Sequence, residues 1–330
     1  MKIYSLEHRS LEEVKPFIGQ CGFIPFNDYN IERAILVNNV IEELSDILYR
    51  GGSVLVAREQ GKTIGLISSE VSQWDSDLFG TKISKIIHLL SSEDYVKSCI
   101  VKRKLVSDLI AECCSKLSVH LSARIYKEDL SSTHALESKS FRLMDVLVTY
   151  SFDLRNKRIN ESEVSCHVRE SKQDEILELA EIASECFSNS PVATDRFHAD
   201  PTLPAEKSGL LYVKWVVDSC KDPSNKVLVA EIDGTPVGFN ICNTNDLLDK
   251  RLGFRLGTIA ITAVKPTERR RLVATSLLNA SLKWFTNKVD VVETGGQVSN
   301  YAIQRAWCKV GFKIIRSQCT FHWSVLPDSL

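Results

Sequence analysis

The sequence predicts an α/β protein made of two related units, each a mixed central sheet flanked by helices, with the N-terminal unit degenerate. Three observations support this prediction. The order helix, hairpin, strand, helix, strand, helix, strand occurs twice along the chain. A strand, a short loop and a helix follow one another over residues 256–278. The 330 residues are 44% hydrophobic and 25% charged, an ordinary globular composition with room for about two domains.

The first unit is expected over residues 1–155. Residues 1–50 are predicted to be mostly helical, because apolar residues recur on one face, and Gly51 and Gly52 end that segment. The stretch 74–80 is interpreted as a turn or a substrate loop. No phosphate-binding pattern occurs in this half, which is why it is expected to be degenerate. Its other elements are predicted as a hairpin at 54–67, strands at 82–90, 118–125 and 144–154, and helices at 95–117 and 132–139.

The second unit is expected over residues 166–330, after a polar stretch at 156–165 that marks the boundary. It repeats the order of the first unit. Its elements are predicted as helices at 172–187, 210–219 and 299–310, and strands at 227–231, 237–242, 290–294 and 313–325, in addition to the segment 256–278.

Residues 256–278 are predicted to form a buried strand that leads through a short loop into a helix. Ile259, Ile261 and Val264 make the first part apolar and β-branched, which favours a strand, and Pro266 ends it. After the loop, apolar residues recur at helical spacing. These are Val273, Leu277, Ala280 and Trp284.

Three consecutive arginines stand where this helix begins. Because a helix N-terminus carries about half a positive charge, exposed cations such as Arg269, Arg270 and Arg271 are disfavoured there by roughly 0.3–1 kcal/mol each. A pyrophosphate bound to the free amides of the first turn would compensate. A solvated basic cluster screened by salt explains the arginines equally well.

The same stretch resembles the acetyl-CoA loop of the GNAT acyltransferase superfamily. Val264, Pro266, Arg269 and Ala274 match the family pattern V-x-P-x-x-[RQ]-x-x-G-x-[GA], whereas the first glycine is Leu272. Glycine allows close approach of the phosphates, although a residue of the first turn can hold helical dihedrals with a side chain. The resemblance implies acetyl-CoA as cosubstrate, held by the strand backbone, the loop and the last helix. The implied contacts are Ile261, Thr262, Ala263, Val264, Arg269, Arg270, Arg271, Leu272, Val273, Ala274, Asn300 and Trp307.

A second family pattern lies in the last helix. There Asn300 begins the helix, and Gly311 and Phe312 end it. In the family a tyrosine, which can protonate the leaving CoA thiolate, often occupies the place of Trp307. An indole N–H donates a hydrogen bond but cannot deliver a proton at neutral pH. Trp307 is therefore interpreted as core packing, and Tyr301, Cys308 or water as a substitute acid.

Amide formation requires a neutral amine and a hydrogen-bond donor for the thioester carbonyl. In the family, a backbone N–H of the strand is the donor. Glu293 and Glu231 lie on strands suited to a general base, and together with Tyr301 they are the predicted catalytic residues. A salt-bridging or surface role is as well supported for either carboxylate.

A narrower resemblance, to bacterial TDP-fucosamine acetyltransferases, rests on short landmarks. It implies a nucleotide-linked amino sugar as the small-molecule acceptor, with Arg196 on a phosphate and Tyr212 or Trp215 stacked on a base or sugar. Transfer to a peptide or antibiotic amine, and a CoA-binding module that has lost its chemistry, are the alternatives. The landmarks are Trp74, Asp75, Phe79, Gly80, Arg196, Phe197, His198, Asp200, Gly209, Tyr212 and Trp215.

Charge and cysteine usage exclude several classes of protein. The net charge is −1 with acids and bases interspersed, so no nucleic-acid surface is expected. No apolar run approaches the roughly 18 residues that span a membrane, and the start lacks a secretion signal. The 10 cysteines form no C-x-x-C pair, so no metal is expected and a reducing cytoplasm is predicted. A homodimer is left open.

Overall fold

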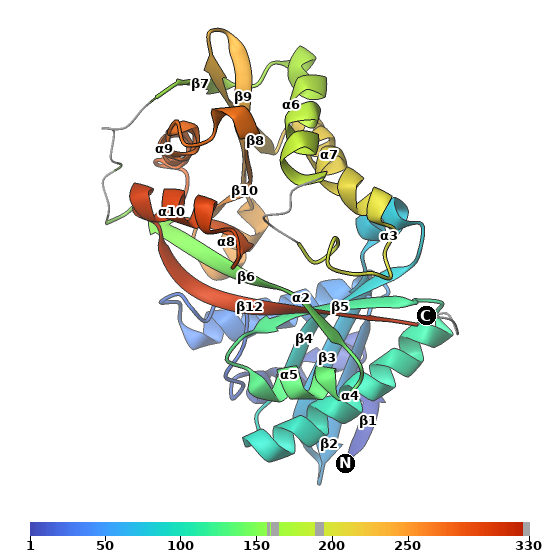
Figure 1. Cartoon of the computed structure of the whole chain (residues 1–330). Helices are drawn as coiled ribbons and strands as arrows, with labels where there is room; N and C mark the ends of the chain where they lie inside the picture. Colours follow the sequence, from blue (N-terminus) through green and yellow to red (C-terminus); the bar gives the residue numbers. More distant parts are fainter. Residues whose placement is uncertain (157–158, 160–164, 189–194, 326–330) are drawn as a thin grey trace. The chain divides into compact units, whose positions relative to one another are not determined.

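The computed structural model describes residues 1–156, 159, 165–188 and 195–325. The chain divides into two compact units (Figure 1). Unit 1 comprises Met1–Val146 and Ser317–Leu330, and unit 2 comprises Leu147–Arg316. Within the described ranges, every helix is too short or too polar to cross a membrane.

Unit 1 is built on a mixed sheet with the strand order β1-β2-β3-β4-β5-β12. Neighbouring strands are antiparallel except for β4 and β5, which are parallel over four residue pairs. The strands are β1 (Lys2–Ser5), β2 (Ser53–Glu59), β3 (Lys62–Val71), β4 (Ile83–Ser91), β5 (His120–Tyr126) and β12 (Lys313–Ser324), of which residues 317–324 belong to this unit.

Helices cover both faces of the unit 1 sheet. The long α4 packs Val101, Leu105 and Leu109 against one face, in a core shared with Ile67 and Leu89. On the other face, α2 lies close enough for Glu43 to bond His88 of β4. The helical segments are η1 (His8–Val14), α1 (Lys15–Ile18), α2 (Arg33–Tyr49), α3 (Gln73–Phe79), α4 (Tyr95–Ser115) and α5 (Leu130–Glu137).

Unit 2 repeats this arrangement with the strand order β7-β8-β9-β10-β11-β6. Here too all neighbours are antiparallel except one parallel pair, β10 with β11. The strands are β6 (Arg142–Asp153), of which residues 147–153 belong to this unit, β7 (His167–Glu170), β8 (Asn225–Ile232), β9 (Thr235–Thr244), β10 (Leu256–Val264) and β11 (Val291–Gln297).

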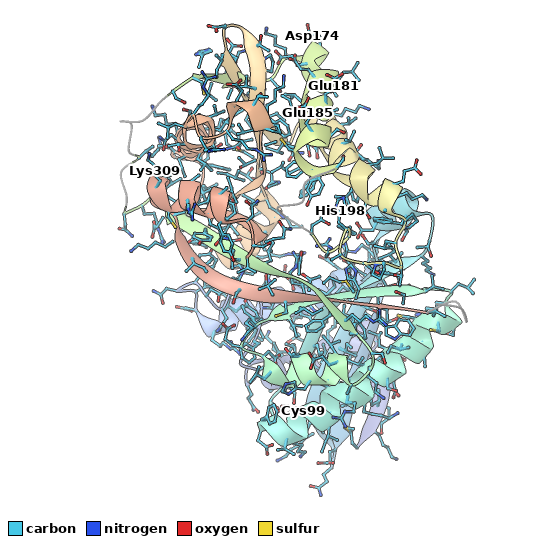
Figure 2. The ribbon with its side chains drawn as sticks, viewed as in Figure 1. Cys99, Asp174, Glu181, Glu185, His198 and Lys309 are labelled. Carbon is cyan, nitrogen blue, oxygen red and sulfur yellow. The ribbon has the colours of Figure 1, made fainter. Side chains whose placement is uncertain are left out.

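Helices also cover both faces of the unit 2 sheet. Figure 1 shows α6 and α7 on one side of β10 and α9 on the other. The α6 sequence is amphipathic: Leu179 and Ile182 are buried, whereas Glu181, labelled in Figure 2, is exposed. The helical segments are η2 (Gln173–Glu175), α6 (Ile176–Ala183), η3 (Ser184–Ser188, one π-helical turn), α7 (Ala205–Lys221), α8 (Asp246–Leu252), η4 (Pro266–Glu268), α9 (Val273–Phe285) and α10 (Tyr301–Val310).

The predicted fold class and the repeated order of elements are confirmed, with three corrections. The chain begins with the strand β1, which was not expected, although η1, α1 and α2 make residues 1–50 mostly helical as predicted. The stretch 74–80 is not a loop but the helix α3, which Gly80 ends in a left-handed conformation. The sequence analysis also missed α8, a short helix at the place in unit 2 that α3 occupies in unit 1.

The two compact units do not coincide with the two halves of the sequence. The predicted boundary at 156–165 falls largely outside the described residues. The units instead divide at Leu147 and Arg316, inside β6 and β12. Each half of the sequence therefore contributes the end of its last strand to the sheet of the other unit.

Candidate active site

Strand β10 bends at a bulge in its middle. Ile259 pairs with Cys242 of β9 and Ile261 pairs with Ile241, so Ala260 between them has no residue opposite it. The parallel pairing of β10 with β11 ends at the same place, at Ile259 and its partner Thr294. Beyond this point the two strands separate, which leaves a main-chain edge on residues 261–264 that an extended, amide-containing ligand can pair with.

The side chain of Thr294 stabilises the point of separation. This buried residue donates a hydrogen bond from Oγ1 to the carbonyl oxygen of Ile259, at 3.1 Å. The last carbonyl of the parallel ladder is therefore satisfied by a side chain. No further pairing of β10 with β11 is needed to satisfy this carbonyl, so the strands can separate here without leaving it unbonded.

The loop after β10 ends in a row of unbonded main-chain amides. The amides of residues 270–275 donate to no acceptor within the described part of the chain, and α9 has no side-chain N-cap. Such amides at the positive end of a helix form a ready anion site.

The arginines of this loop are partly compensated by the protein itself. Arg269 donates from Nε to the carbonyl oxygen of Val264 at 3.3 Å, and Arg271 donates from Nη1 to Glu268 Oε2 at 2.6 Å. Both side chains are exposed, as is Arg270. Glu268 thus compensates the charge of Arg271 at the helix start without a bound anion. Arg269 and Arg270 have no carboxylate partner among the described residues, and they lie beside the unbonded amides.

Leu272, at the place of the family glycine, adopts a left-handed conformation with φ 62° and ψ 10°. The expectation that a side chain here could sit in helical dihedrals is wrong. The backbone itself favours glycine, because the left-handed region costs other residues roughly 1–2 kcal/mol. Leu272 holds the turn at a cost in strain and remains part of the loop that presents the amides.

Cys186 ties this loop to α6, and the sequence analysis did not single it out. Its thiol donates to the carbonyl oxygen of Val264, at 3.2 Å, from the π-helical turn that ends α6. Burial raises the pKa of the Cys186 thiol, and the nearby Arg269 guanidinium only partly offsets this. Cys186 is therefore a neutral hydrogen-bond donor at the end of β10, not a nucleophile.

The predicted residues of the last helix have structural roles in this arrangement. Trp307 is buried against Tyr150, with ring centroids 5.1 Å apart, and a Cβ on Gly296 would come within 3.1 Å of its ring. Asn300 is the N-cap of α10 and accepts from the amide of Ile303. Tyr301 is 66% exposed at the first position of that helix.

The structure does not bring the two predicted carboxylates together. Glu293 on β11 is buried and accepts from Arg316 at 2.8 Å. Glu231 on β8 accepts from Arg169 at 2.6 Å, and Arg169 also binds Glu175. Three strand spacings, about 14 Å, separate β8 from β11. Each carboxylate is thus held in an ion pair, the structural role that the sequence also allowed.

The predicted acceptor residues lie around the start of α7. Tyr212 stacks on Phe187 with ring centroids 4.2 Å apart and on Trp215 at 6.1 Å, so the structure does bring the two predicted aromatic residues together. The guanidinium of Arg196 lies 4.3 Å over the ring of Phe197, in the loop between α6 and α7. This aromatic stack is on the face of β10 that lies opposite α9.

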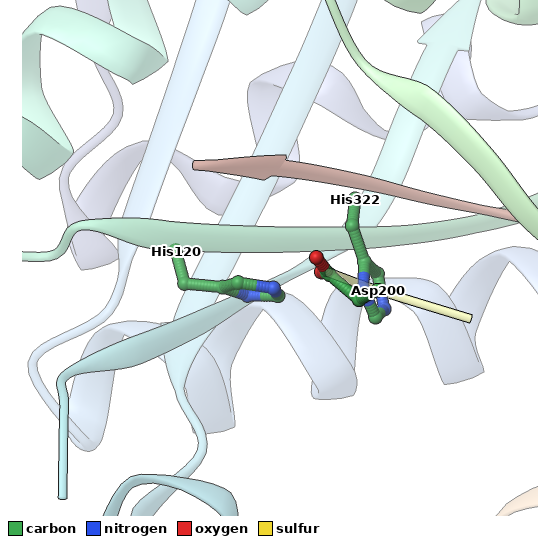
Figure 3. Close-up of side chains that lie close together, drawn as sticks. All are labelled: His120, Asp200 and His322. Carbon is green, nitrogen blue, oxygen red and sulfur yellow. The ribbon is translucent and has the colours of Figure 1, made fainter. Parts of the chain in front are cut away.

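Two histidines that are distant in sequence meet in unit 1. His322 of β12 and His120 of β5 are buried, and their rings meet edge to face with centroids 4.7 Å apart (Figure 3). His322 was interpreted from the sequence as a strand residue and not as a base. Its packed position in the sheet of unit 1 agrees with that interpretation.

Comparisons with known proteins support the same fold. Residues 176–312 match the model of the acetyltransferase (GNAT) family. A GCN5-related N-acetyltransferase from Sphaerobacter thermophilus is similar over 99% of this chain and 96% of its own, at 13% identity and a TM-score of 0.64. A tandem GNAT protein from the clavulanic acid biosynthesis pathway is similar over 99% of both chains, at 11% identity and a TM-score of 0.59. The comparison with curated proteins finds no match.

A third similar structure is a glucosamine N-acetyltransferase region of a fungal multi-domain protein, at 16% identity and a TM-score of 0.62, over 98% of this chain and 38% of that chain. At such identities these structures establish the fold alone. The bulged strand, the separated strands and the amide-lined loop all lie within residues 176–312, the part of the chain that matches the acetyltransferase (GNAT) family model. Unit 2 carries the part of the chain that matches the family model. The narrower resemblance to TDP-fucosamine acetyltransferases remains a prediction.

Proposed function

We propose that unit 2 transfers an acetyl group from acetyl-CoA to an amine by direct attack in a ternary complex. One observation carries this proposal: a bulged strand that separates from its parallel neighbour leads within a few residues to six unbonded amides at a helix start. The strand edge suits a ligand with amide groups, and the helix start suits its phosphates. CoA combines both kinds of group in one molecule.

Each part of the site has a distinct task in binding. The amides of residues 270–275 bind the pyrophosphate, and Arg269 and Arg270 add charge. The main chain of Ile261, Thr262, Ala263 and Val264 pairs with the pantetheine arm. Leu272, Val273 and Ala274 shape the turn and begin the helix. Asn300 and Trp307 support this site indirectly, by capping α10 and by packing against β11.

The reaction requires little more than positioning. The bound substrate supplies a thioester carbonyl, and a main-chain N–H near residues 261–264 donates to its oxygen as negative charge develops. The neutral amine attacks the carbonyl carbon, so a C–N bond forms and the C–S bond breaks. The thiolate is a good leaving group and takes a proton from water, since Trp307 cannot provide one, while the nitrogen of the new amide gives up a proton to water.

A nucleotide-linked amino sugar is the acceptor class to test first. The stack of Phe187, Tyr212 and Trp215 offers a flat apolar surface for a base or sugar ring, and Arg196 lies in the adjoining loop. One structural neighbour is itself described as a glucosamine N-acetyltransferase region. A peptide or antibiotic amine would use the same face of the sheet.

The second candidate function is a CoA-binding module without chemistry. Two observations favour it: Leu272 strains the phosphate loop, and Trp307 stands where many relatives have a proton-donating tyrosine. Such a module would bind the cofactor through the same amides. It would differ from the enzyme only in turnover.

A panel assay separates these functions. The full chain is incubated with acetyl-CoA and amino-sugar nucleotides, free amino sugars, peptides or aminoglycosides, and both free CoA and acetylated product are measured by chromatography. Turnover restricted to the sugar nucleotides supports the first acceptor class, and turnover only with other amines replaces it. Saturable CoA binding without product from any amine supports the module. No CoA binding by calorimetry at modest salt refutes the proposal.

A further inference from the structure

The loop between α6 and α7 holds an aspartate–histidine pair. Asp195 is buried and accepts from the amides of Phe197 and His198 through Oδ1, at 2.8 and 3.1 Å. Its other oxygen, Oδ2, lies 2.8 Å from His198 Nδ1 (Figure 2 labels His198). One carboxylate therefore fixes both the backbone of the turn and the orientation of the imidazole ring.

This contact leaves the other ring nitrogen of His198 available. When Asp195 accepts from Nδ1–H, the neutral imidazole presents a lone pair at Nε2. Nε2 is buried, and within the described residues it has no hydrogen-bond partner. Burying an acceptor without a donor is unfavourable. An imidazole that donates from Nδ1 to a carboxylate and has an unbonded lone pair at Nε2 has the arrangement of a general base.

Contacts within unit 2 place this loop on the acceptor side of the sheet. The carbonyl of Phe197 accepts from Ser208 at 3.1 Å, so the loop is fastened to the first turns of α7. One turn later Tyr212 stacks on Phe187, and the residue before Phe187 donates to the end of β10. The loop that carries His198 is thus fastened to α7, the helix that packs on the face of β10 opposite α9.

The three catalytic residues predicted from the sequence are less suited to accept the proton. Glu293 and Glu231 each accept from an arginine, and proton uptake by either would break an ion pair. Tyr301 is largely exposed on α10. His198 alone among the residues considered for this role combines an orienting carboxylate with an unused basic atom.

We propose that His198 Nε2 accepts the proton of the incoming ammonium group, and that Asp195 is the positioning residue that holds the imidazole ready. This inference rests on the proposed function and names the base of the same site. The ammonium N–H bond breaks and the proton moves to Nε2, which frees the lone pair that attacks the thioester. The imidazolium later releases that proton to water, and the overall products are the amide, CoA and one proton.

The test compares two kinds of acceptor. A strongly basic amine reaches the site protonated and needs His198, whereas hydroxylamine is largely neutral at pH 8 and does not. His198→Gln should lower kcat on the basic amine about a hundredfold, the size of a general-base effect, and lower it only a few-fold with hydroxylamine. The KM for acetyl-CoA should not change. Equal losses on both acceptors, or no loss on either, would overturn the role of His198.

Two further measurements exclude a merely structural role. Imidazole added to His198→Ala should restore part of the rate, because it replaces the missing base, and Asp195→Asn should lower kcat with the same preference for basic amines. His167→Ala, an exposed histidine of β7, is the matched control and should behave as wild type. Failure of rescue together with a lowered melting temperature would assign Asp195 and His198 to folding alone. If the wild-type chain turns over no amine, the proposed function has failed, which is a different result.

Discussion

The two units share the geometry of the separated strands but differ in the loop that follows. In unit 1, β4 has a bulge at Ile87, and its parallel pairing with β5 ends at Ile86, after four residue pairs. In unit 2, β10 has its bulge at Ala260, and its parallel pairing with β11 also spans four residue pairs. The separation of the strands is therefore a property of the shared fold and does not by itself indicate a binding site.

The loops that lead into α4 of unit 1 and α9 of unit 2 carry opposite charge. In unit 1 the chain enters α4 through Glu93 and Asp94, and the Asp94 carboxylate accepts from the amide of Lys97 at 3.0 Å. In unit 2 the chain enters α9 through arginines, and the first amides are unbonded. The first unit satisfies its own helix N-terminus with an acid. The second unit leaves the corresponding amides unbonded within its described residues, and the degeneracy of unit 1 stays a prediction.

Unit 1 also contains a cluster of buried polar side chains that satisfy one another. Lys102 of α4 is bonded to Asp129 at 2.8 Å, and Ser131 and Ser132 bond the same carboxylate. Burial acts to raise the pKa of Asp129, but the charge and hydrogen bond of Lys102 more than offset this, and the pKa is lowered. The comparison teaches that unit 1 pairs its buried charges and caps its helix start internally, whereas unit 2 leaves the amides at the start of α9 unbonded within the described residues.

The largest effect is expected from breaking the internal ion pair of unit 1. Lys102→Met should lower the free energy of unfolding by about 3–5 kcal/mol, because it leaves Asp129 buried and uncompensated. Urea denaturation measures this. Lys104→Met is the matched control, since Lys104 is paired with Asp108 on the exposed side of the same helix and should change stability by less than about 0.5 kcal/mol. Equal effects of the two substitutions would contradict this account.

The same pair predicts a pH dependence. Because the folded pKa of Asp129 is lowered, its contribution to stability is complete above its unfolded pKa of about 3.9 and is lost as the pH falls through the folded value. In Lys102→Met the buried, uncompensated Asp129 should take up a proton on folding, so its cost should lessen and the difference in stability between the two proteins should shrink as the pH falls. Acid titrations of unfolding for both proteins provide the measurement, and a difference in stability that stays constant down to low pH would speak against it.

The second-largest effect is expected when the acidic helix start of unit 1 is copied into unit 2. Leu272→Asp places a carboxylate at the start of α9, as Asp94 does at the start of α4, and should weaken CoA binding about a hundredfold by repulsion of the pyrophosphate. Leu272→Asn is the control, because asparagine also tolerates the left-handed conformation but carries no charge. Calorimetry distinguishes them, and similar dissociation constants would argue that no phosphate binds there.

The third effect tests the arginines. Arg269→Ala should weaken CoA binding about tenfold, as expected for the loss of a charge-assisted hydrogen bond. Arg103→Ala removes an exposed arginine of α4 in unit 1 and should leave the affinity unchanged. The affinities should converge at high salt, since exposed charges are screened. An unchanged affinity in Arg269→Ala would remove this residue from the site.

The smallest effect concerns backbone strain. Leu272→Gly should raise the free energy of unfolding by about 0.5–1 kcal/mol, because glycine adopts φ near +62° without strain, and CoA should bind equally or more tightly. Leu117, which follows α4 in unit 1, has the same φ. Leu117→Gly should stabilise the chain similarly and leave CoA binding alone. A loss of stability in either variant would count against strain at that leucine.

Much of the fold was predictable because its signals are local. The period of apolar residues identified β10, α9 and α4 close to their observed bounds. The missed helix α8 has only seven residues, too few to show a clear helical period, yet Asn245 caps its start and Gly253 ends it at φ 60°, and both residues could have predicted it. Strand β1 was missed because its four residues are mostly exposed.

The site was predictable only in part, because its remaining contacts join residues that are distant in sequence. The loop at 265–274 was identified from its arginines and its family pattern. The arginine partners of Glu293 and Glu231 lie 23 and 62 positions away, and no spacing rule connects them. The hydrogen bond from the Cys186 thiol to the carbonyl of Val264 joins residues 78 positions apart, and no sequence pattern predicts it.

The sequence by itself determined where strands and helices form, that they repeat in two units, and which helix start is basic. These properties depend on neighbours within a few residues. Only the tertiary structure decided which carboxylates are neutralised, that the units exchange the ends of their last strands, and that Asp195 orients His198. Hydrogen bonds and ion pairs depend on distances between side chains, and folding alone sets those distances.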